Sequence, residues 1–448
     1  MRKTLLFVFS ILGTVAFSQE HFSGINTSRR TGLLNARNNP AELANIKKKY
    51  EVNVFNFSAN IANNKMSFSD LIDNNDNFEE MLFSGSEPLN MRVDVEILGP
   101  AFAFKVNKWT FGIATAAKVK ASLVDINTTL GNALTNGGID NINEVYDVLA
   151  SENQRATGTS WGEIGFSVAR ELYDNEKHHF NGGVTLKLLF PGTYANMGAS
   201  EFRGTVQNNL GTVTLTDASA QVNLAYSGSL AGDFSESENF TEFFAGGLNG
   251  FATDLGINYQ LKSVNPNRYL LNAGVAVRNI GSMTFKNDNN VTSYYKLEIP
   301  EGQFLGLNQF EDAKSIEDVE NILENETGFF EKSEESKDFK VKLPTIFSAY
   351  ADLNVYNNWY ATGYIQQRTS DDNNNDQVVV QNIISITPRY STDYFEVYTP
   401  LADNEISGFT AGLGFRVGGF FMGSSSALSV ALGDPNQADF YFGFRTLL

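Results

Sequence analysis

Apolar and polar residues alternate along extended stretches of this chain. From residue 251 to 262, one side of the alternation carries Phe251, Thr253, Leu255, Ile257, Tyr259 and Leu261, and the other carries Ala252, Asp254, Gly256, Asn258, Gln260 and Lys262. The stretch from Tyr269 to Arg278 repeats the pattern. A period of two residues is typical of a β-strand with two unlike faces. A soluble β-sandwich also alternates, but runs of about ten residues suit tilted strands that cross a bilayer.

Fourteen segments of this kind set the expected architecture. They lie near residues 51–61, 90–106, 109–124, 159–172, 180–190, 249–262, 268–280, 341–356, 358–369, 377–390, 394–400, 406–417, 419–432 and 438–447. Bacterial outer-membrane barrels have an even number of antiparallel strands. We therefore expect an all-β fold over residues 51–448, a transmembrane antiparallel up-and-down β-barrel of about 14 strands. Further alternation at Val222, Leu224 and Tyr226 leaves 16 strands as the alternative.

The connections between these segments fall into two groups by length. The long connections, expected to form extracellular surface loops, are 62–89, 125–158, 191–248 and 281–340. The tight turns are 107–108, 357–358, 391–393 and 418–419. Outer-membrane barrels keep short turns on the periplasmic side and long loops outside. This division places the start of the first strand in the periplasm.

Several of the long connections have helical or acidic character. Residues 62–89 and 125–158 contain short helical-looking stretches, such as 142–149. Residues 311–338 contain eleven acidic residues, and the spacing of Ile316, Val319 and Leu323 predicts an amphipathic helix among them. This acidic segment is either a site for cations or a partner, or a solvated surface loop. We favour the solvated loop, since blocks of like charge are usually solvated.

The first eighteen residues have the features of a secretory signal peptide. Arg2 and Lys3 precede an apolar run at residues 5–17, and a small-residue cleavage site ends at Ser18. The run is shorter than the roughly 20 residues of a spanning helix. The chain has no cysteine, so it has no lipid attachment site and no disulfide. We expect export to the cell outer membrane.

Composition fits this picture and argues against nucleic acid or anionic lipid as a partner. The net charge of −18 becomes −20 once the two basic residues of residues 1–18 are removed, and such a charge repels polyanions. The 36 Phe and 17 Tyr are typical of β-structure. The mean hydropathy of −0.22 is that of a soluble protein, but alternation explains it, because only every second residue of a barrel strand is apolar. We expect a monomer in contact with outer-membrane lipid.

Three parts of the chain resemble a known superfamily. Residues 31–44, with Asn39-Pro40-Ala41 at their centre, resemble the N-terminal hatch of the FadL/OmpP1 outer-membrane transporters. Two further stretches look like the Bacteroidetes branch, which includes PorV-like proteins: Asp254-Leu255-Gly256 with Tyr259, followed by Arg278-Asn279-Ile280-Gly281, and Leu343-Pro344-Thr345. The last strand resembles the C-terminal assembly signal of such barrels, with Leu448 in place of the usual aromatic residue.

The resemblance implies a non-enzymatic barrel that passes or captures an apolar small molecule. The alternative that it leaves open is a PorV-like accessory of type IX secretion or outer-membrane assembly, with a secreted or surface protein as its partner. An apolar pocket in the lumen would favour passage of a hydrophobic ligand. Exposed apolar loop tips around a closed lumen would favour the accessory role.

The residues themselves support a plug between the signal peptide and the first strand. Pro40 fixes its own φ and forces Asn39 into an extended conformation, and the small Ala41 permits a close approach to a wall. A polar segment such as residues 19–50 cannot form its own core, but it can hydrogen-bond to a polar lumen. Asn39, Pro40 and Ala41 are therefore our hatch candidates. The alternative is a disordered periplasmic leader.

Motifs for catalysis or metal binding are weak. Gly158 to Gly162 matches Gly-x-Ser-x-Gly, but a nucleophile elbow needs a helix after the strand and a partnered histidine. The histidines are His21, His178 and His179, and the fold predicted here places His178 and His179 far from Ser160. The oxygen-rich segment 371–376 lacks the glycine of a calcium loop and is expected as a solvated turn. We expect no enzyme activity, metal or cofactor.

Charged residues on the polar faces of the strands are the candidate lumen residues. We select Asp254, Arg278, Asp352 and Arg416. The same faces also carry Asp94, Glu96, Lys118, Lys120, Glu163 and Lys187. Mixed charge in a narrow barrel favours paired networks around a plug over a wide channel, and a specific ligand site is the alternative.

Overall fold

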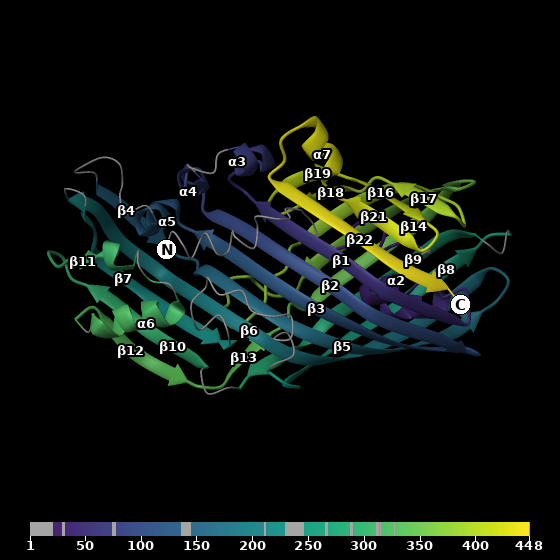
Figure 1. Cartoon of the computed structure of the whole chain (residues 1–448), viewed down its shortest axis with the longest axis horizontal. Helices are drawn as coiled ribbons and strands as arrows, with labels where there is room; N and C mark the ends of the chain where they lie inside the picture. The colour runs from purple at the N-terminus through teal and green to yellow at the C-terminus, as the bar shows by residue number, and fades with distance from the viewer. Residues whose placement is uncertain are drawn as a thin grey trace.

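In the computed structural model, the chain forms one elongated body, with a closed β-barrel at one end and a curved sheet at the other (Figure 1). The structure describes residues 21–28, 32–73, 78–135, 145–209, 212–228, 246–264, 268–286, 290–310, 313, 315–326 and 328–447. The expected signal peptide, residues 1–18, lies outside the described residues. No helix in the described part of the chain is long and apolar enough to span a bilayer.

Fourteen antiparallel strands of the described chain close the barrel, as the alternation predicts. The first strand pairs with the last, so that no edge remains. Around the barrel the strands are β1 (Tyr50–Asn63), β2 (Leu89–Val106), β3 (Trp109–Ile126), β5 (Gln154–Asp174), β6 (His178–Asn209), β8 (Gly250–Lys262), β9 (Tyr269–Phe285), β14 (Ile346–Tyr356), β15 (Trp359–Arg368), β16 (Ile383–Ser391), β17 with β18 (Phe395–Tyr398, Leu401–Asn404), β19 with β20 (Gly408–Ala411, Leu413–Val417), β21 (Phe420–Ser424) and β22 (Gln437–Leu447).

The outer surface of the barrel is an apolar belt. On β8, Leu255 and Ile257 are 49% and 58% exposed, whereas Asp254 and Asn258 are each 1% exposed. The pattern recurs around the barrel, with exposed Val54, Ile113, Phe166, Leu186, Phe347, Ile365, Ile386 and Phe415. A soluble protein buries its apolar face, so apolar side chains outside and charges inside indicate that lipid surrounds this barrel.

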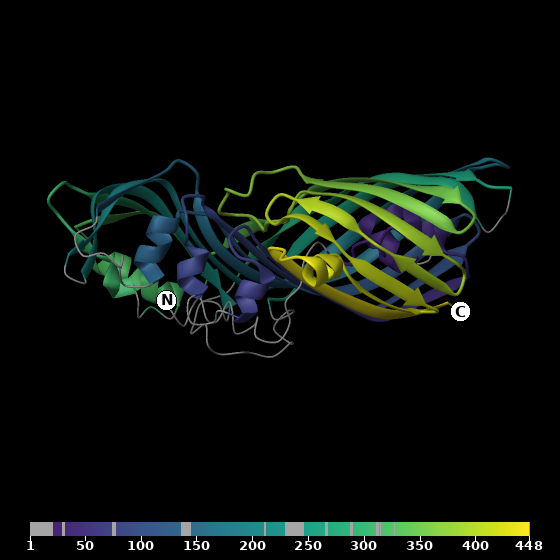
Figure 2. The same ribbon diagram turned by 90° about the horizontal axis from the view of Figure 1, so that it is seen from above.

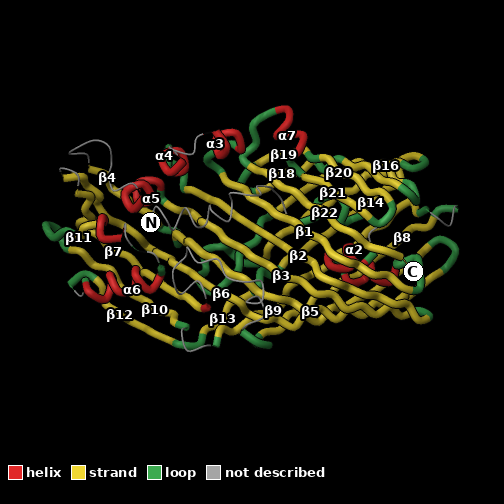
Figure 3. Tube along the Cα trace, viewed as in Figure 1, coloured by secondary structure: helices red, strands yellow, loops and turns green. Residues whose placement is uncertain are grey.

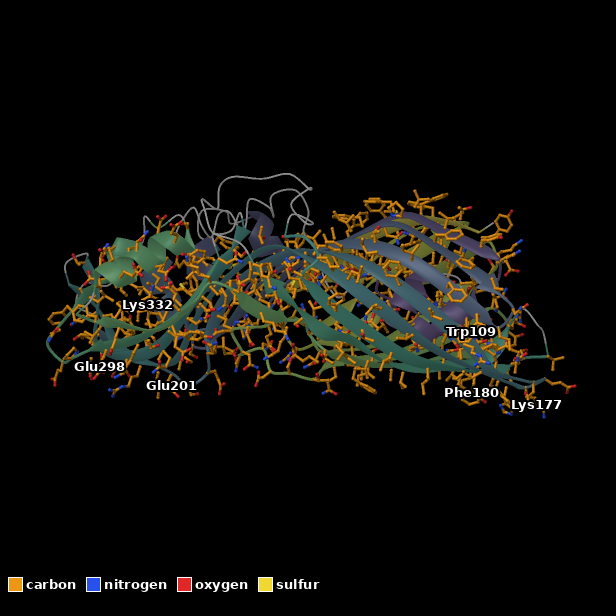
Figure 4. All side chains as sticks on the ribbon, turned by 90° about the horizontal axis from the view of Figure 1, so that it is seen from below. Trp109, Lys177, Phe180, Glu201, Glu298 and Lys332 are labelled. Carbon is orange, nitrogen blue, oxygen red and sulfur yellow. The ribbon has the colours of Figure 1, made fainter. Side chains whose placement is uncertain are left out.

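Aromatic side chains gather at the barrel end that carries the tight turns. Exposed there are Tyr50, Trp109, Tyr173, Phe180, Tyr356, Trp359, Tyr394 and Phe395. Figure 4 shows Trp109 and Phe180 at this end, beside Lys177 of the β5–β6 turn. Aromatic girdles of this kind mark the boundary between lipid and water.

Several strands depart from their expected bounds, and two of them give way to other structure. The strand expected at 377–390 starts only at Ile383, because the residues before it cross the mouth of the barrel. The strand expected at 419–432 ends at Ser424, and helix α7 (Ala427–Leu432) follows it. Val378, Val379 and Val380 before β16 are buried across the mouth, whereas Val430 and Leu432 of α7 are exposed.

The alternation predicts Tyr269 on the apolar, outward face with Leu271 and Val275, but its side chain faces the lumen. The pairing of β8 with β9 shifts register after Leu261 and leaves Leu270 as an extra residue. Leu270 is therefore 47% exposed to lipid, and Tyr269 is buried with its hydroxyl bonded to Asp352. A one-residue slip reverses the faces of a strand locally.

Beyond the barrel, β6 and its neighbours continue as a curved extension of the same sheet, here called the head. β6 has 32 residues, far more than the roughly 9–11 that a tilted strand needs to cross a bilayer. The head strands pair in the order β4, β6, β7, β10 and β12. Their bounds, with those of the two shorter strands nearby, are β4 (Val145–Ala150), β7 (Thr212–Ser227), β10 (Val291–Ile299), β11 (Leu305–Gly306), β12 (Phe330–Ser336) and β13 (Phe339–Lys342).

The head corrects the expectation that 125–158, 191–248 and 281–340 are loops, since its strands lie in these segments. Val222, Leu224 and Tyr226 belong to β7 of the head, so the barrel keeps fourteen strands. The stretch expected as helical at 142–149 contains β4 from Val145 onward, and 142–144 lie outside the described residues.

Helices cover one face of the head sheet and complete its core (Figure 2). They are α5 (Thr128–Thr135), η4 (Leu307–Phe310) and α6 (Ile316–Asn325). The predicted amphipathic helix is confirmed as α6, which buries Ile316 and Leu323 and begins with a capping box between Ser315 and Asp318. Two short helices, α3 (Phe68–Asp73) and α4 (Phe78–Leu82), lie in the β1–β2 connection.

Candidate functional site: the closed barrel lumen

The described residues 21–28 and 32–46, here called the plug, lie inside the barrel (Figure 2). Helix α2 (Leu33–Asn38) begins after Gly32, which has φ +41°. A Cβ at Gly32 would lie 2.0 Å from a carboxylate oxygen of Glu51, and the amide of Leu33 donates to the same carboxylate at 2.9 Å. Glycine at this point lets the chain turn against the barrel wall.

A short 3-10 helix, η1 (Pro40–Asn45), follows α2. Asn39 between them is extended, with φ −149° and ψ 111°, as expected for a residue before proline. Its side-chain oxygen accepts from the amide of Ala41 at 3.0 Å and caps η1. Ala41 is fully buried.

Glycines in the wall receive the Asn39-Pro40 corner. A Cβ at Gly256 would lie 2.0 Å from the side-chain oxygen of Asn39, and one at Gly183 would lie 2.4 Å from the carbonyl carbon of Pro40. The Asn39 amide nitrogen donates to the carbonyl of Ile257 at 2.9 Å. The wall glycines that contact this corner are Gly183, Gly256 and Gly274. The corner therefore lies close against the wall, and Ala41 takes part in this approach, because its backbone nitrogen would lie 2.5 Å from a Cβ at Gly183.

The carboxylate of Glu42 fixes the plug to the same wall. It accepts hydrogen bonds from Asn258 at 2.9 Å and from Asn272 at 2.8 Å, and a further bond from the hydroxyl of Tyr350. Asn45 donates to its second oxygen at 2.7 Å. A buried carboxylate with this many donors is well stabilised, so the plug is held by specific bonds as well as by shape.

The other side of the plug is tied to acidic residues. His21 lies 2.9 Å from Asp94, and Arg37 forms an ion pair with Glu96. The hydroxyl of Ser28 donates to Glu396 at 2.9 Å. The plug therefore contacts opposite sides of the barrel and spans its lumen.

Charges of alternating sign form an arc around part of the lumen, here called the charge arc. Acidic residues on β2, β5 and β8 alternate with basic residues on β3, β6 and β9. The charge arc consists of Asp94, Glu96, Lys118, Lys120, Glu163, Lys187, Asp254 and Arg278. Lys118 lies 3.3 Å from Glu96 and 3.2 Å from Glu163, and Lys187 lies 2.8 Å from Asp254. Mutual pairing is the condition under which charges are tolerated in a buried site.

A second closure crosses the opposite end of the lumen. Residues 369–382, here called the lid, connect β15 to β16 and reach strands across the barrel. Fully buried Arg155 on β5 donates to the carbonyl of Asp372 at 2.8 Å and to that of Gln377 at 3.0 Å. The hydroxyl of Tyr194 on β6 donates to the carbonyl of Asn375 at 2.7 Å.

The Asp372 side chain binds the lid to strands on two sides of the barrel mouth. It pairs with Arg92 on β2 and lies 2.6 Å from Arg368 on β15. Burial raises the pKa of Asp372 and outweighs the opposing effect of the two arginines. The segment 371–376 forms turns with Asp371 and Asn374 exposed, as expected of a solvated turn, but Asp372 is 6% exposed, because two arginines pair with its carboxylate.

A chamber of about 110 Å³ lies between the plug and the lid. The plug contributes Phe22, Leu34 and Arg37, and Val380 of the lid lies on the other side. The walls include Trp161 and several residues of the charge arc, among them the predicted Asp254 and Arg278. Arg278 donates to Gln366 at 2.7 Å, and Asp254 accepts from the amide of Asn279 at 2.7 Å. The chamber joins apolar side chains to paired charges.

The other two predicted lumen residues lie outside the chamber. Asp352 accepts from Thr362 at 2.6 Å and lies 3.9 Å from Arg389 in a separate buried network. Arg416 donates to the carbonyls of Gly418 at 2.8 Å and Thr392 at 3.0 Å, and so braces two tight turns. The structure thus brings together two of the four selected residues.

The Gly-x-Ser-x-Gly motif around Ser160 and the cluster around His179 lie at different ends of the barrel. Gly158 to Gly162 lie wholly within β5, with no helix after them, and Ser160 lies 3.0 Å from the hydroxyl of Thr193. His179 lies 2.7 Å from Asp174 near the tight turns, with Glu171 nearby. Lys262 also pairs with the carboxylate of Asp174.

Sequence reasoning missed several residues that hold the closures. Arg92 has the parity of Asp94 and Glu96 on its strand, so the alternation contained a signal for it. Arg155 has the parity of Glu163, but the expected strand began too late to include it. Arg37 and His21 carried no signal, since their partners depend on how the plug is placed.

Comparison with known families rests on most of the chain. Residues 40–425 match the model of a family described as being of unknown function (DUF5723). The chain belongs to the DUF5723 family. The match of the DUF5723 model runs from the Asn39-Pro40 corner through the head and lid to the β21–β22 connection. No curated protein matches the chain.

Among solved structures, the chain is similar to two toluene transporters. TodX of Pseudomonas putida is 9% identical and has a TM-score of 0.43, with 93% of this chain and 94% of that chain covered. TbuX of Ralstonia pickettii is 10% identical and has a TM-score of 0.42, with 97% and 96% covered. The translocator domain of the autotransporter NalP from Neisseria meningitidis is 5% identical at a TM-score of 0.32, with 90% of each chain covered. Likeness at this level does not specify function.

The expected subfamily gains no support from these comparisons. None of the three structures is a secretion accessory protein, and the DUF5723 description names no branch. The Bacteroidetes placement and the PorV-like relationship remain expectations from sequence.

Proposed function

We propose that this protein lies in the cell outer membrane and passes a small apolar molecule through its plugged barrel. Residues 1–18 would direct export and be removed, and the rest would act as a monomer surrounded by lipid. The apolar belt and the aromatic girdle support the membrane location. The tight turns would face the periplasm, and the head would lie outside the cell.

The observation that supports passage is a chamber closed by two separate segments. The plug precedes β1 and the lid connects β15 to β16, so neither is a barrel strand and either can move without breaking one. Phe22, Leu34, Trp161 and Val380 give the chamber apolar contact surface. A cavity of roughly 150 Å³ holds one benzene ring, so the chamber of about 110 Å³ is slightly too small. Entry of cargo therefore requires one closure to shift.

A disulfide between the lid and the wall tests this proposal. A Cβ at Gly198 would lie 3.0 Å from the Cγ of Asn375, so the two Cβ atoms are at most about 4.5 Å apart, within disulfide range. The chain has no other cysteine. In Gly198→Cys/Asn375→Cys cells, we expect uptake of toluene to be slow when oxidised and to recover after reduction.

A matched pair in the head serves as the control. Ser219 and Glu298 face each other across β7 and β10, so Ser219→Cys/Glu298→Cys forms a disulfide that leaves the lid free. Uptake in this variant should not depend on oxidation. Equal uptake by the oxidised and reduced lid variant would contradict passage through the chamber.

A further inference from the structure

Helix α7 presents an apolar surface where the barrel wall ends. Its six residues, Ala427–Leu432, include no charged side chain, and none of them is buried. Leu432 is 86% exposed and Val430 37% exposed. The helix lies beside β19 and β22, at the barrel end away from the tight turns (Figure 1).

This exposed helix is nonetheless held firmly. The hydroxyl of Ser429 accepts from the amide of Ala411 on β19 at 2.8 Å. At its start, the carboxylate of Asp439 on β22 accepts from the amide of Ser426 at 2.9 Å. A helix of six residues is not stable alone in water, so these bonds to the wall maintain it. Its apolar face is therefore a fixed feature of the barrel rim.

The apolar face of α7 continues the lipid-facing belt. Phe409 on β19, the strand that α7 contacts, is 64% exposed, and Leu413 and Phe415 follow it on β20. Asp403 on β18 pairs with Phe409 and is also exposed. A charged side chain of this kind belongs at the membrane surface rather than in hydrocarbon. The α7 helix thus lies where the belt meets the polar interface.

We propose that α7 is a lipid anchor, with Val430 and Leu432 inserted among the acyl chains just below the head groups at the head end of the barrel. Short apolar helices at this depth bury one face about 5–10 Å into the boundary between head groups and chains. The anchor fixes the depth of the rim beneath the lid. Its occupant is membrane hydrocarbon, and the role does not depend on which molecule the barrel passes.

Fluorescence quenching by brominated lipid tests the anchor. Leu432→Cys, in the full chain without other cysteines, is labelled with an environment-sensitive nitrobenzoxadiazole probe and placed in phosphatidylcholine vesicles. We expect blue-shifted emission and a loss of about half the intensity with bromine near the head groups. Bromine near the chain ends should quench less.

Two further sites make the outcome decisive. Leu149→Cys labels a leucine of the head that is 81% exposed, and its probe should emit as in water without quenching. Phe409→Cys labels the belt and should be quenched. If the probe at Leu432 behaves like the probe at Leu149, α7 lies in water and the anchor is disproved. Shielding of Leu432 in intact cells but not in vesicles would assign the surface to a protein partner and would equally overturn the proposal.

Discussion

At the residue scale, the placement of the plug depends on where side chains are absent. Gly183, Gly256 and Gly274 leave room in the wall that the Asn39-Pro40 corner occupies. The extended Asn39 was predictable, because proline constrains the residue before it. The lumen facing of Gly256 was also predictable, because it shares the parity of Asp254 and Asn258, but parity does not show which strands of the wall the plug contacts.

Filling one of these positions should loosen the plug. Gly256→Val places a side chain where the Asn39 oxygen lies, and overpacking of this kind costs about 1–3 kcal/mol. We expect a cysteine introduced at Leu34, which is 5% exposed, to react faster with a water-soluble maleimide in this variant. Gly363→Val, where no heavy atom lies within 4 Å, should leave the rate unchanged. Equal rates in both variants would disprove the anchoring role of Gly256.

The facing of the strands can be tested with one charge in two environments. Leu255 is 49% exposed on the barrel belt, and Leu149 is 81% exposed on the head. Leu255→Arg should destabilise the protein by about 2–4 kcal/mol, as expected for a charge facing lipid near the midplane. Leu149→Arg faces water and should have little effect. Refolding titrations in vesicles measure both, and similar costs would mean that the belt does not face lipid.

At the scale of elements, the alternation located strands well and misjudged what surrounds them. The barrel strands follow from period two, but so do β4 and β7, and only the pairing partners place these in the head. β4 was expected to be helical, yet Tyr146, Val148 and Ala150 all face the head core, which is a period of two. Helix α6 was predictable, because its apolar spacing and capping box are local features.

A buried carboxylate links α6 to the head sheet. Glu320 accepts hydrogen bonds from Ser293 at 2.6 Å and from Tyr226 and Tyr295 at 2.8 Å. Burial alone would raise the pKa of Glu320, but these bonds and Lys332 lower it below the ordinary value of 4.5. Because the folded pKa is depressed, the stabilisation is present above pH 4.5 and is lost as the pH falls through the folded value.

Replacing this carboxylate should therefore weaken the head in a pH-dependent way. At pH 7, Glu320→Gln should destabilise the head by about 1–3 kcal/mol, from weakened hydrogen bonds. Limited proteolysis of the head should show a difference from wild type at pH 7 that shrinks below pH 4.5. Glu324→Gln, which also removes a partner of Lys332 but is half exposed, should have a small effect. A difference that persists unchanged in acid would contradict this account.

At the scale of the whole molecule, the two ends of the barrel are chemically distinct. One end carries tight turns and an aromatic girdle with Trp109 and Phe180, and the other carries the head with Glu298 and Lys332 (Figure 4). The lid crosses the lumen at the head end. The lid departs most from what the sequence predicts. The polar sequence at 371–376 predicts a solvated turn, because the arginines that bind the lid, Arg92 and Arg155, come from distant strands.

Protease accessibility should report the orientation of the molecule. Proteinase added to intact cells should cut within 311–338 of the head. The turns at 357–358 and 418–419 should be cut only after the outer membrane is permeabilised. The opposite pattern would mean that the orientation is inverted, and recovery of the protein in the soluble periplasmic fraction would disprove the membrane location.

The central claim is that two independent closures seal the lumen, and conductance in planar bilayers tests it most directly. Four proteins are compared: the native chain, a deletion of 26–44, a chain with 371–381 replaced by a short glycine-serine turn, and the combination. We expect the native protein to conduct little, because both closures cross the lumen, and each single variant to open only briefly. The combined variant should conduct steadily. Steady conductance by the native protein, or a closed combined variant, would contradict the claim.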